Sequence, residues 1–320
     1  MRIVFMGTGE IALPSLRFLL QESADHQLVA VYTQPDKKIG RKQILTPPEV
    51  KVLAEEANIP VFQPLRFRGD EEALDSLRQL EPDLIVVMAY GQILPKEVIE
   101  APSIACVNLH ASLLPRHRGA SPIQAAIREG DAESGITLMH VAAKLDAGDM
   151  ILKHSISIQS NETGGSLHDR LAELGPAILE EGLPLFADGS ASATPQDDAL
   201  VTYAGKLERE HGRIDWTRPA EKIERLIRAY DPWPGTYMEL EIRDRIRKCK
   251  IYPGCEVLAD HTGEPGRIQP DGNTLIVTCG EGSLRLQGEL QLEGKKRLPV
   301  ADFLRGTELP AKAILEASPE

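Results

Sequence analysis

The sequence predicts an α/β fold with a mostly parallel sheet, followed by a smaller β-barrel domain. In the first half of the chain, apolar runs of strand length alternate with segments of helical period. That alternation is the layout of parallel strands joined by crossover helices. From residue 236 onward, short β-prone stretches follow one another with turns between them, such as Asp271-Gly272-Asn273. Repeated short strands with tight turns indicate a small antiparallel barrel.

The expected elements of the first half follow from the positions of the apolar residues. Residues 84–88 are apolar throughout, as expected for a central strand covered on both faces. The crossovers between such strands should be right-handed. Strands are expected at residues 2–6, 27–32, 83–89, 105–109, 136–141 and 150–158, and helices at 12–21, 48–57, 70–80, 121–129 and 166–174.

A change in composition predicts two domains. The chain has 320 residues, which exceeds the size at which a single core usually stops growing. Residues 188–198 are small and polar with one proline, as is typical of a linker. We expect a first domain over residues 1–189, a linker over 190–205 and a second domain over 206–320. The second domain should contain a helix at residues 220–229 and strands at 236–242, 246–252, 256–258, 266–269, 274–279 and 283–292.

The charge of the chain limits its partners. The formal net charge is −12, which counts against a protein that coats nucleic acid broadly and leaves room only for local basic contacts. Basic residues do gather locally, at residues 243–250, at 295–297 and in a loop after the second expected strand. An ordinary solvated loop or hairpin is the alternative for each cluster. The cluster after the second strand consists of Lys37, Lys38, Arg41 and Lys42.

Cysteine usage and the lengths of the apolar runs predict the compartment. The four cysteines show neither a C-x-x-C pair nor the spacing of metal ligands. No apolar run exceeds strand length, and Met1 leads directly into the first expected strand. We therefore expect a cytoplasmic, reduced protein without a bound metal, a signal peptide or a membrane-spanning segment.

An amide, an imidazole and a carboxylate form the most informative pattern of the chain. Asn108 and His110 end an expected strand two residues apart, so their side chains share one face of it. Asp146 follows later in the segment Leu145-Asp146-Ala147-Gly148-Asp149. An imidazole moves a proton near neutral pH, an amide N–H stabilises a developing oxyanion, and a carboxylate orients the ring or stabilises its charge. The three groups together predict the transfer of a carbonyl-type group.

A purely structural His110 is the alternative, because a lone histidine near a strand end is usually a packing residue. The residues that follow it favour a site. Residues 116–122 are rich in arginine, glycine and proline and come just past the carboxyl end of a strand, where ligands bind in open α/β sheets. No serine or cysteine stands in a recognisable nucleophile motif, so we expect no covalent enzyme intermediate.

An enzyme that binds a nicotinamide dinucleotide is an alternative function from another class of protein. Residues 7–12 fit the pattern G-x-G-x-x-A between a first strand and a first helix. The acidic residue that should end the second strand and hold a ribose hydroxyl is missing, since Asp36 lies beyond Pro35. A tight turn that packs the helix against the strand is the better interpretation of these glycines.

The ordered motifs resemble those of a known family. The run N-x-H-x-S-L-L-P-x-x-R-G at residues 108–119, with D-x-G-D at 146–149, resembles the formyltransferases that use 10-formyltetrahydrofolate. Further matches lie at residues 213–216 and 228–235, and the resemblance extends from Met1 to about Leu304. Within this family the chain is most similar to the members that formylate methionyl initiator tRNA for translation initiation.

The resemblance implies a fold and a set of functional residues. The first domain should be Rossmann-like and the second an OB-like domain that helps to hold the tRNA, in a protein that acts as a monomer. The sequence has Lys42 where relatives often have glycine after Gly-Arg, and Ala111 where many have glycine. The implied catalytic residues are Asn108, His110 and Asp146, those for the folate co-substrate are Ser112, Leu113, Leu114, Pro115, Gln92, Ile93 and Leu94, and those for tRNA are Lys37, Lys38, Arg41, Lys42 and Lys206.

Two other functions remain open on these residues. A formyltransferase acting on a small amine, such as glycinamide ribonucleotide or an amino sugar nucleotide, would carry the same three catalytic groups. The basic loop and the second domain favour tRNA. A non-catalytic RNA-binding protein that merely keeps the fold is the other candidate, and the intact Asn108, His110 and Asp146 argue against it.

Overall fold

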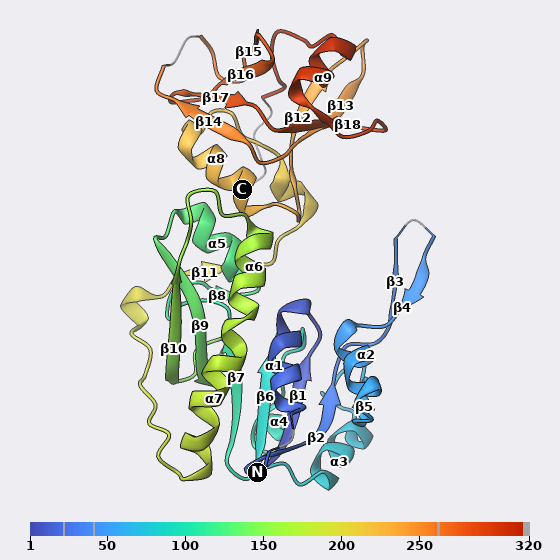
Figure 1. Cartoon of the computed structure of the whole chain (residues 1–320), viewed down its shortest axis with the longest axis vertical. Coiled ribbons are helices and arrows are strands. Elements are labelled where there is room, and N and C mark those ends of the chain that lie inside the picture. The colour runs from blue at the N-terminus through green and yellow to red at the C-terminus, as the bar shows by residue number, and fades with distance from the viewer. Residues whose placement is uncertain (22, 41, 261–262, 316–320) are drawn as a thin grey trace. The chain divides into compact units, whose positions relative to one another are not determined.

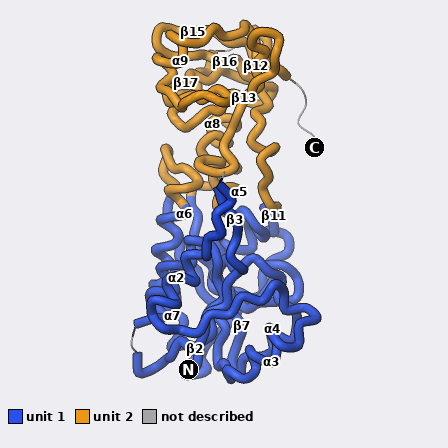
Figure 2. The backbone as a smooth tube through the Cα atoms, turned by 90° about the vertical axis from the view of Figure 1, so that its right-hand side faces the viewer, with its two compact units in different colours: residues 1–122, 133–157, 168–204 blue, residues 123–132, 158–167, 205–320 orange. Residues whose placement is uncertain are grey.

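The computed structural model describes the whole chain except residues 22, 41, 261–262 and 316–320 (Figure 1). Arg41, one of the residues predicted to bind tRNA, therefore lies outside the described residues. The chain forms two compact units (Figure 2). Unit 1 comprises residues 1–122, 133–157 and 168–204, and unit 2 comprises residues 123–132, 158–167 and 205–320.

Unit 1 is built on a seven-stranded sheet (Figure 1). The five strands from β7 to β5 pair in parallel, and β9 pairs antiparallel with both β7 and β10, which confirms the mostly parallel sheet. In spatial order the strands are β10 (Met150–Ser157), β9 (Glu133–His140), β7 (Ala105–His110), β6 (Leu84–Met88), β1 (Arg2–Gly7), β2 (Gln27–Tyr32) and β5 (Val61–Phe62).

Helices cover both faces of this sheet, which is why β6 is buried along its whole length. One layer contains α3 (Glu71–Gln79) and α4 (Lys96–Ile99), whose Leu74, Leu77 and Val98 belong to a core with alternate residues of β1 and β6. The other layer contains α1 (Leu13–Leu19) and α7 (Leu174–Ala187), which pack on each other, and α7 also packs on β9 and β10. α2 (Glu49–Glu56) packs beside α1 and β5.

Two features of unit 1 differ from the sequence-based expectation. The helix expected at residues 166–174 corresponds to α6 (Gly164–Ala172), but the separate helix α7, which begins at Leu174, was not predicted. α7 is apolar around most of its circumference, so it lacks the periodicity that identifies a surface helix. The basic stretch after β2 was expected to be a loop, but it forms the hairpin β3 (Lys37–Ile39) and β4 (Ile44–Thr46), whose strands are too short to predict from periodicity.

Unit 2 contains two four-stranded antiparallel sheets around one core, which confirms the β-rich second domain. The segment at residues 283–292 was predicted as one strand, but it is divided at Gln287 and Gly288, whose backbone nitrogens both donate to Gly254. The helix α9 (Val300–Gly306) was not predicted. The other elements are α5 (Pro122–Glu129), α8 (Ala220–Ala229), the sheet β12 (Thr236–Glu241), β13 (Ile246–Ile251), β18 (Glu289–Leu292) and β19 (Leu298–Pro299), and the sheet β14 (Cys255–Leu258), β17 (Ser283–Leu286), β16 (Thr274–Thr278) and β15 (Ile268–Asp271).

Candidate active site

The end of β7 brings two of the three predicted catalytic side chains to one face of the sheet. Asn108 and His110 alternate with the buried Val107 and Leu109, so both point to the same side of the strand. The Nδ1 atom of His110 lies 3.8 Å from Oδ1 of Asp146, and the two side chains are only 7% and 11% exposed. The Nε2 atom of His110 lies 3.0 Å from the carbonyl oxygen of His117. The ring thus faces one oxygen at each nitrogen.

This environment defines what the imidazole can do. A neutral ring donates through only one nitrogen, whereas an imidazolium donates through both. With an oxygen acceptor beside each nitrogen, His110 makes two attractive contacts at once only when it is protonated. A protonated ring here places positive charge beside Asn108. That charge suits an oxygen atom that becomes negative during a reaction.

Asn108 differs from its neighbours because its amide is not used by the protein. The residue is half-buried, and its side chain hydrogen-bonds to no other residue in the described part of the chain. A polar side chain that is shielded from water usually has a hydrogen-bond partner. The two N–H groups of Asn108 are therefore available to a ligand.

The loop that carries Asp146 is held in an uncommon backbone conformation. Asp146 has a φ of 49°, in the left-handed region, and its Oδ2 accepts a hydrogen bond of 2.8 Å from the backbone nitrogen of Gly119. Two residues later, a Cβ atom on Gly148 would lie 1.8 Å from the carbonyl oxygen of His140. Only glycine fits there, so the glycine of the D-x-G-D motif lets the Asp146 loop lie directly against β9.

A glutamine from the expected linker, Gln196, also holds this loop in place, and no sequence pattern predicts this contact. The Nε2 atom of Gln196 donates to the carbonyl oxygens of Asp146, at 2.9 Å, and Gly148, at 2.8 Å. Its Oε1 accepts from Nε of Arg118, a buried arginine that also approaches Asp198 at 3.6 Å. Contacts between residues far apart in sequence leave no local pattern.

The first segment predicted to hold the folate, residues 112–115, is held in place by hydrogen bonds to other residues of the protein. Ser112 and Leu114 are buried, while Leu113 and Pro115 are half-buried. Thr137 Oγ1 donates to the Ser112 carbonyl at 2.6 Å and accepts from the Leu114 nitrogen at 3.1 Å. The hydroxyl of Ser112 donates to the Arg116 carbonyl at 2.7 Å. Ser112 therefore shapes the loop, and the parts of the segment that reach the surface are Leu113 and Pro115.

The second predicted folate segment follows β6 at the same edge of the sheet. Leu94 packs against the core, Ile93 is 85% exposed, and the Gln92 amide donates to the Pro64 carbonyl at 2.9 Å. The exposed Ile93 presents apolar surface of the kind that covers the face of a planar ring.

The glycine-rich first turn has a structural explanation. A Cβ atom on Gly7 would lie 2.7 Å from the Phe5 ring and 3.1 Å from the Met88 carbonyl. The hydroxyl of Thr8 donates to the Tyr90 carbonyl at 2.9 Å. The turn thus connects the ends of β1 and β6 by direct packing, as expected for a tight turn.

Asp36 does not stand where a dinucleotide enzyme needs an acidic residue. Its carboxylate accepts from Gln63 at 2.8 Å and from Lys51 at 3.0 Å. These hydrogen bonds, that of Gln63 above all, hold the pKa of Asp36 below its usual value. The carboxylate is occupied in anchoring the base of the β3–β4 hairpin.

The predicted tRNA-binding lysines are all exposed. Lys37, Lys38 and Lys42 lie on the β3–β4 hairpin of unit 1, and Lys206 lies at the start of the long segment of unit 2. The hairpin also exposes Ile44 and Leu45, at 61% and 62%. It therefore combines positive charge with apolar surface.

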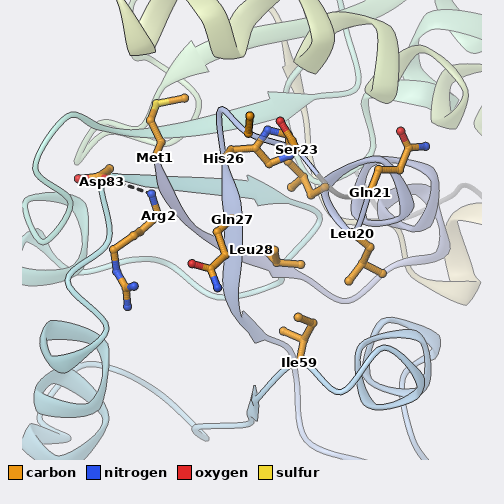
Figure 3. Close-up of a pocket in the computed structure, with 12 residues that line it drawn as sticks. Met1, Arg2, Leu20, Gln21, Ser23, His26, Gln27, Leu28, Ile59 and Asp83 are labelled. Carbon is orange, nitrogen blue, oxygen red and sulfur yellow. Dashed lines mark hydrogen bonds between the residues drawn. The ribbon is translucent and has the colours of Figure 1, made fainter.

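A cavity of about 840 Å³ lies at the opposite end of the strands (Figure 3). It is lined by the start of β1 and β2, where the Arg2 nitrogen donates to Asp83 at 2.7 Å. None of the predicted catalytic residues lines it. In open α/β sheets ligands bind at the carboxyl ends of the strands. We therefore do not assign the catalytic site to this cavity, which lies at their amino ends.

In the described parts of the chain, no helix is long and apolar enough to cross a membrane, and no cluster of three or more His, Cys, Asp or Glu side chains is placed to hold a metal ion.

The fold is an open α/β sheet, and the polar groups at its carboxyl edge are of a kind that suits acyl transfer. The chain belongs to the formyl transferase family: residues 1–183 match the formyl transferase domain, and residues 206–308 match the formyl transferase C-terminal domain. It is 51% identical over 308 residues to the methionyl-tRNA formyltransferase of Akkermansia muciniphila, covering 96% of both chains. It is 47% identical to the methionyl-tRNA formyltransferase of Geobacter sulfurreducens, covering 99% of this chain and 98% of the other.

Solved structures share the fold at low identity. One is an N-formyltransferase from Helicobacter canadensis in complex with folinic acid and dTDP-3-aminofucose, with a TM-score of 0.65, 16% identity and coverage of 89% of this chain and 98% of the other. Another is HypX from Aquifex aeolicus in complex with tetrahydrofolic acid, with a TM-score of 0.59, 19% identity and coverage of 95% and 47%.

Proposed function

We propose that this chain transfers the formyl group of 10-formyltetrahydrofolate to the α-amine of methionine esterified to initiator tRNA. The likeness of 51% over nearly the whole chain to a methionyl-tRNA formyltransferase carries this proposal. The approach of His110 to Asp146 beside the free amide of Asn108 supplies chemistry that suits it.

The reaction needs no covalent bond to the enzyme. The neutral amine attacks the formyl carbon and forms a tetrahedral intermediate whose oxygen is negative. The intermediate then collapses, the bond to N10 breaks, and N10 takes up a proton as the attacking nitrogen loses one. An α-amine has a pKa of about 8, so an appreciable fraction is already neutral at cellular pH.

We assign the three side chains to this charge and proton. The Asn108 amide donates to the oxyanion, and the His110 ring, held between the His117 carbonyl and Asp146, places positive charge beside it. The formyl oxygen competes with the His117 carbonyl for the Nε2–H of His110. Asp146 supports the charged ring, and it is also the group placed to guide a proton from the amine toward N10.

The folate site is assigned to the surface around these residues. Residues 112–115 follow β7 and residues 92–94 follow β6, so both segments lie at the same edge of the sheet. Backbone groups of these loops suit the donors and acceptors along the edge of a pterin, and apolar side chains such as Ile93 and Leu113 suit its faces. Solved structures of this fold with folinic acid or tetrahydrofolic acid support a folate co-substrate.

The remaining parts of the chain are assigned to the tRNA. We propose that residues 1–189 are the catalytic domain, that residues 190–205 link the domains, and that residues 206–320 help to hold the tRNA. Lys37, Lys38, Arg41 and Lys42 would contact phosphates, with Lys206 contributing from the second domain. The protein would act as a cytoplasmic monomer in translation initiation.

A comparison of acceptors tests this function. The purified chain is given 10-formyltetrahydrofolate labelled in the formyl group, with methionyl initiator tRNA, glycinamide ribonucleotide or an amino sugar nucleotide as acceptor. We expect label only on the methionyl-tRNA. Transfer to a small amine in preference to methionyl-tRNA would favour the small-acceptor function, and transfer to none of them would leave only a non-catalytic role.

A further inference from the structure

A second cavity, of about 400 Å³, lies on the catalytic edge of the sheet and has no role in the chemistry above. The first turn, the segment after β2, the base of the β3–β4 hairpin and the start of α2 form its walls. His168 of α6 completes it. All of these residues belong to unit 1.

The position of the cavity relates it to the formyl-transfer site. The turn at Thr8 follows β1 and the segment at Gln34 follows β2, so the cavity lies at the carboxyl ends of these strands. In the order β7, β6, β1, β2, with neighbouring strands about 4.8 Å apart, the ends of β1 and β2 lie roughly 10 and 14 Å from that of β7. A group bound in the cavity thus lies on the same edge of the sheet as the formyl-transfer site, two to three strands away from the end of β7.

Gln34 supplies an unusual feature of this cavity. Its backbone is fixed on both sides, because its nitrogen donates to the Thr8 hydroxyl at 3.1 Å and its carbonyl accepts from Gln63 at 2.8 Å. Its side chain lines the cavity, yet its Nε2 atom is buried without a hydrogen-bond partner among the described residues. An unsatisfied buried donor costs about 1–3 kcal/mol. Rotation of the terminal amide toward a ligand in the cavity would remove that cost.

The other lining groups fit one kind of ligand. Pro35, Ile39 and Pro47 provide apolar walls for a flat ring. The exposed Lys37 at the hairpin base suits a phosphate, and the carboxylate of Glu10 suits a ribose hydroxyl or an exocyclic amine. A glutamine amide pairs with adenine through one donor and one acceptor. The methionine side chain is a poorer candidate for this cavity, because its thioether is only a weak hydrogen-bond acceptor and would leave these polar groups unpaired.

We propose that this cavity binds the terminal adenosine of the tRNA acceptor strand, with Gln34 hydrogen-bonded to the base. The proposal rests on the proposed function, which makes that nucleoside the carrier of the reacting methionine. Across the ester and the ribose, the adenine ring of an extended aminoacyl-adenosine is roughly 8–10 Å from the α-amine, on ordinary bond lengths. This span is similar to the separation between the ends of β7 and β1.

The test compares Gln34→Leu with Gln27→Leu in the full chain. Gln27 is a matched control because it starts β2, the strand that Gln34 follows, and because it is exposed and lines the other cavity. We expect Gln34→Leu to raise the KM for methionyl initiator tRNA roughly tenfold, the size of one lost base contact, with little change in the KM for 10-formyltetrahydrofolate. Gln27→Leu should leave both constants unchanged. A Gln34→Leu chain with the wild-type KM for tRNA would overturn the proposal.

A binding experiment without tRNA provides a second readout. Adenosine 5′-monophosphate should inhibit wild-type formylation competitively against tRNA and more strongly than cytidine 5′-monophosphate, and Gln34→Leu should abolish that difference. Equal inhibition by the two nucleotides in the wild type would contradict an adenine site. Both measurements need an active wild-type enzyme, so failure of the proposed function would show first, as absent formylation.

Discussion

At the scale of single residues, the candidate site depends on how closely its loops approach the sheet. Asp146 can face His110 only because the chain around it accepts a left-handed residue and a glycine against β9. Gln196 then ties the same loop down through two backbone carbonyls. The proposed chemistry uses three side chains, while their geometry is set by neighbours to which we assign no part in the reaction.

Gly148 gives a direct prediction about this geometry. In Gly148→Ala the new Cβ atom would meet the His140 carbonyl, so the Asp146 loop must move away. We expect the rate of formyl transfer to fall at least tenfold. The free energy of unfolding should fall by about 1–3 kcal/mol, as it does at other overpacked positions. Gly205→Ala is the control, because nothing lies within 4 Å of a Cβ atom there. Transfer rates and urea unfolding measure both effects, and a fully active Gly148→Ala would show that the loop position does not matter.

At the scale of elements, the β3–β4 hairpin is the feature that the proposed tRNA substrate explains best. It exposes lysines and apolar residues together, although the chain as a whole carries a formal net charge of −12. Such a surface suits the phosphates and unstacked bases of an RNA end.

Charge reversal on the hairpin should therefore act on tRNA alone. In Lys37→Glu/Lys38→Glu/Lys42→Glu we expect the KM for methionyl-tRNA to rise at least tenfold and its dependence on salt to become flatter, because fewer phosphate contacts release fewer counterions. The KM for 10-formyltetrahydrofolate should not change. Arg78→Glu at the end of α3 is the control for a surface charge reversal. An unchanged salt dependence in the triple variant would remove the hairpin from the tRNA site.

The junction of β1 with the segment before β6 depends on the charge of Asp83. Its carboxylate accepts from the Arg2 nitrogen, the larger cause, and from Ser103, and these bonds lower its pKa. A lowered pKa in the folded state adds stability above the ordinary pKa of about 4, and this stability is lost as pH falls through the folded-state value. We expect Asp83→Asn to be on the order of 1 kcal/mol less stable at neutral pH, a figure reduced for solvent exposure, and nearly equal to wild type at about pH 3. Urea midpoints at the two pH values test this, and an equal difference at both would contradict it.

At the scale of the whole molecule, the cysteines report on the two units separately. Cys106 lies in unit 1 and Cys249 and Cys279 lie in unit 2, and burial raises the pKa of each thiol to about 12. We expect alkylation near pH 8 to be on the order of a thousandfold slower in the folded chain than in denaturant. Mass spectrometry of the alkylated chain at increasing urea would then show the order in which the units open. Rapid alkylation of Cys106 in native buffer would contradict the buried position of β7.

How much of this could be predicted from the sequence depends on how local each signal is. Strand alternation and the motif at residues 108–119 are local, so the parallel sheet and the position of Asn108 and His110 at the end of a strand could be predicted. The helix α7 has only two polar side chains, Glu180 and Glu181, so its helical period is hard to recognise, and the hairpin strands are too short. The contacts of Gln196 with the Asp146 loop, and the unsatisfied amide of Gln34, arise only when distant segments fold together.

The central claim is that His110, supported by Asp146 and beside Asn108, stabilises the charge that develops on the transferred formyl group. The most direct measurement is the single-turnover rate of formyl transfer to methionyl initiator tRNA by His110→Ala, at saturating 10-formyltetrahydrofolate. We predict a loss of about 10²- to 10³-fold in a chain that is still folded by circular dichroism. A folded His110→Ala chain that transfers formyl groups at nearly the wild-type rate would contradict the account.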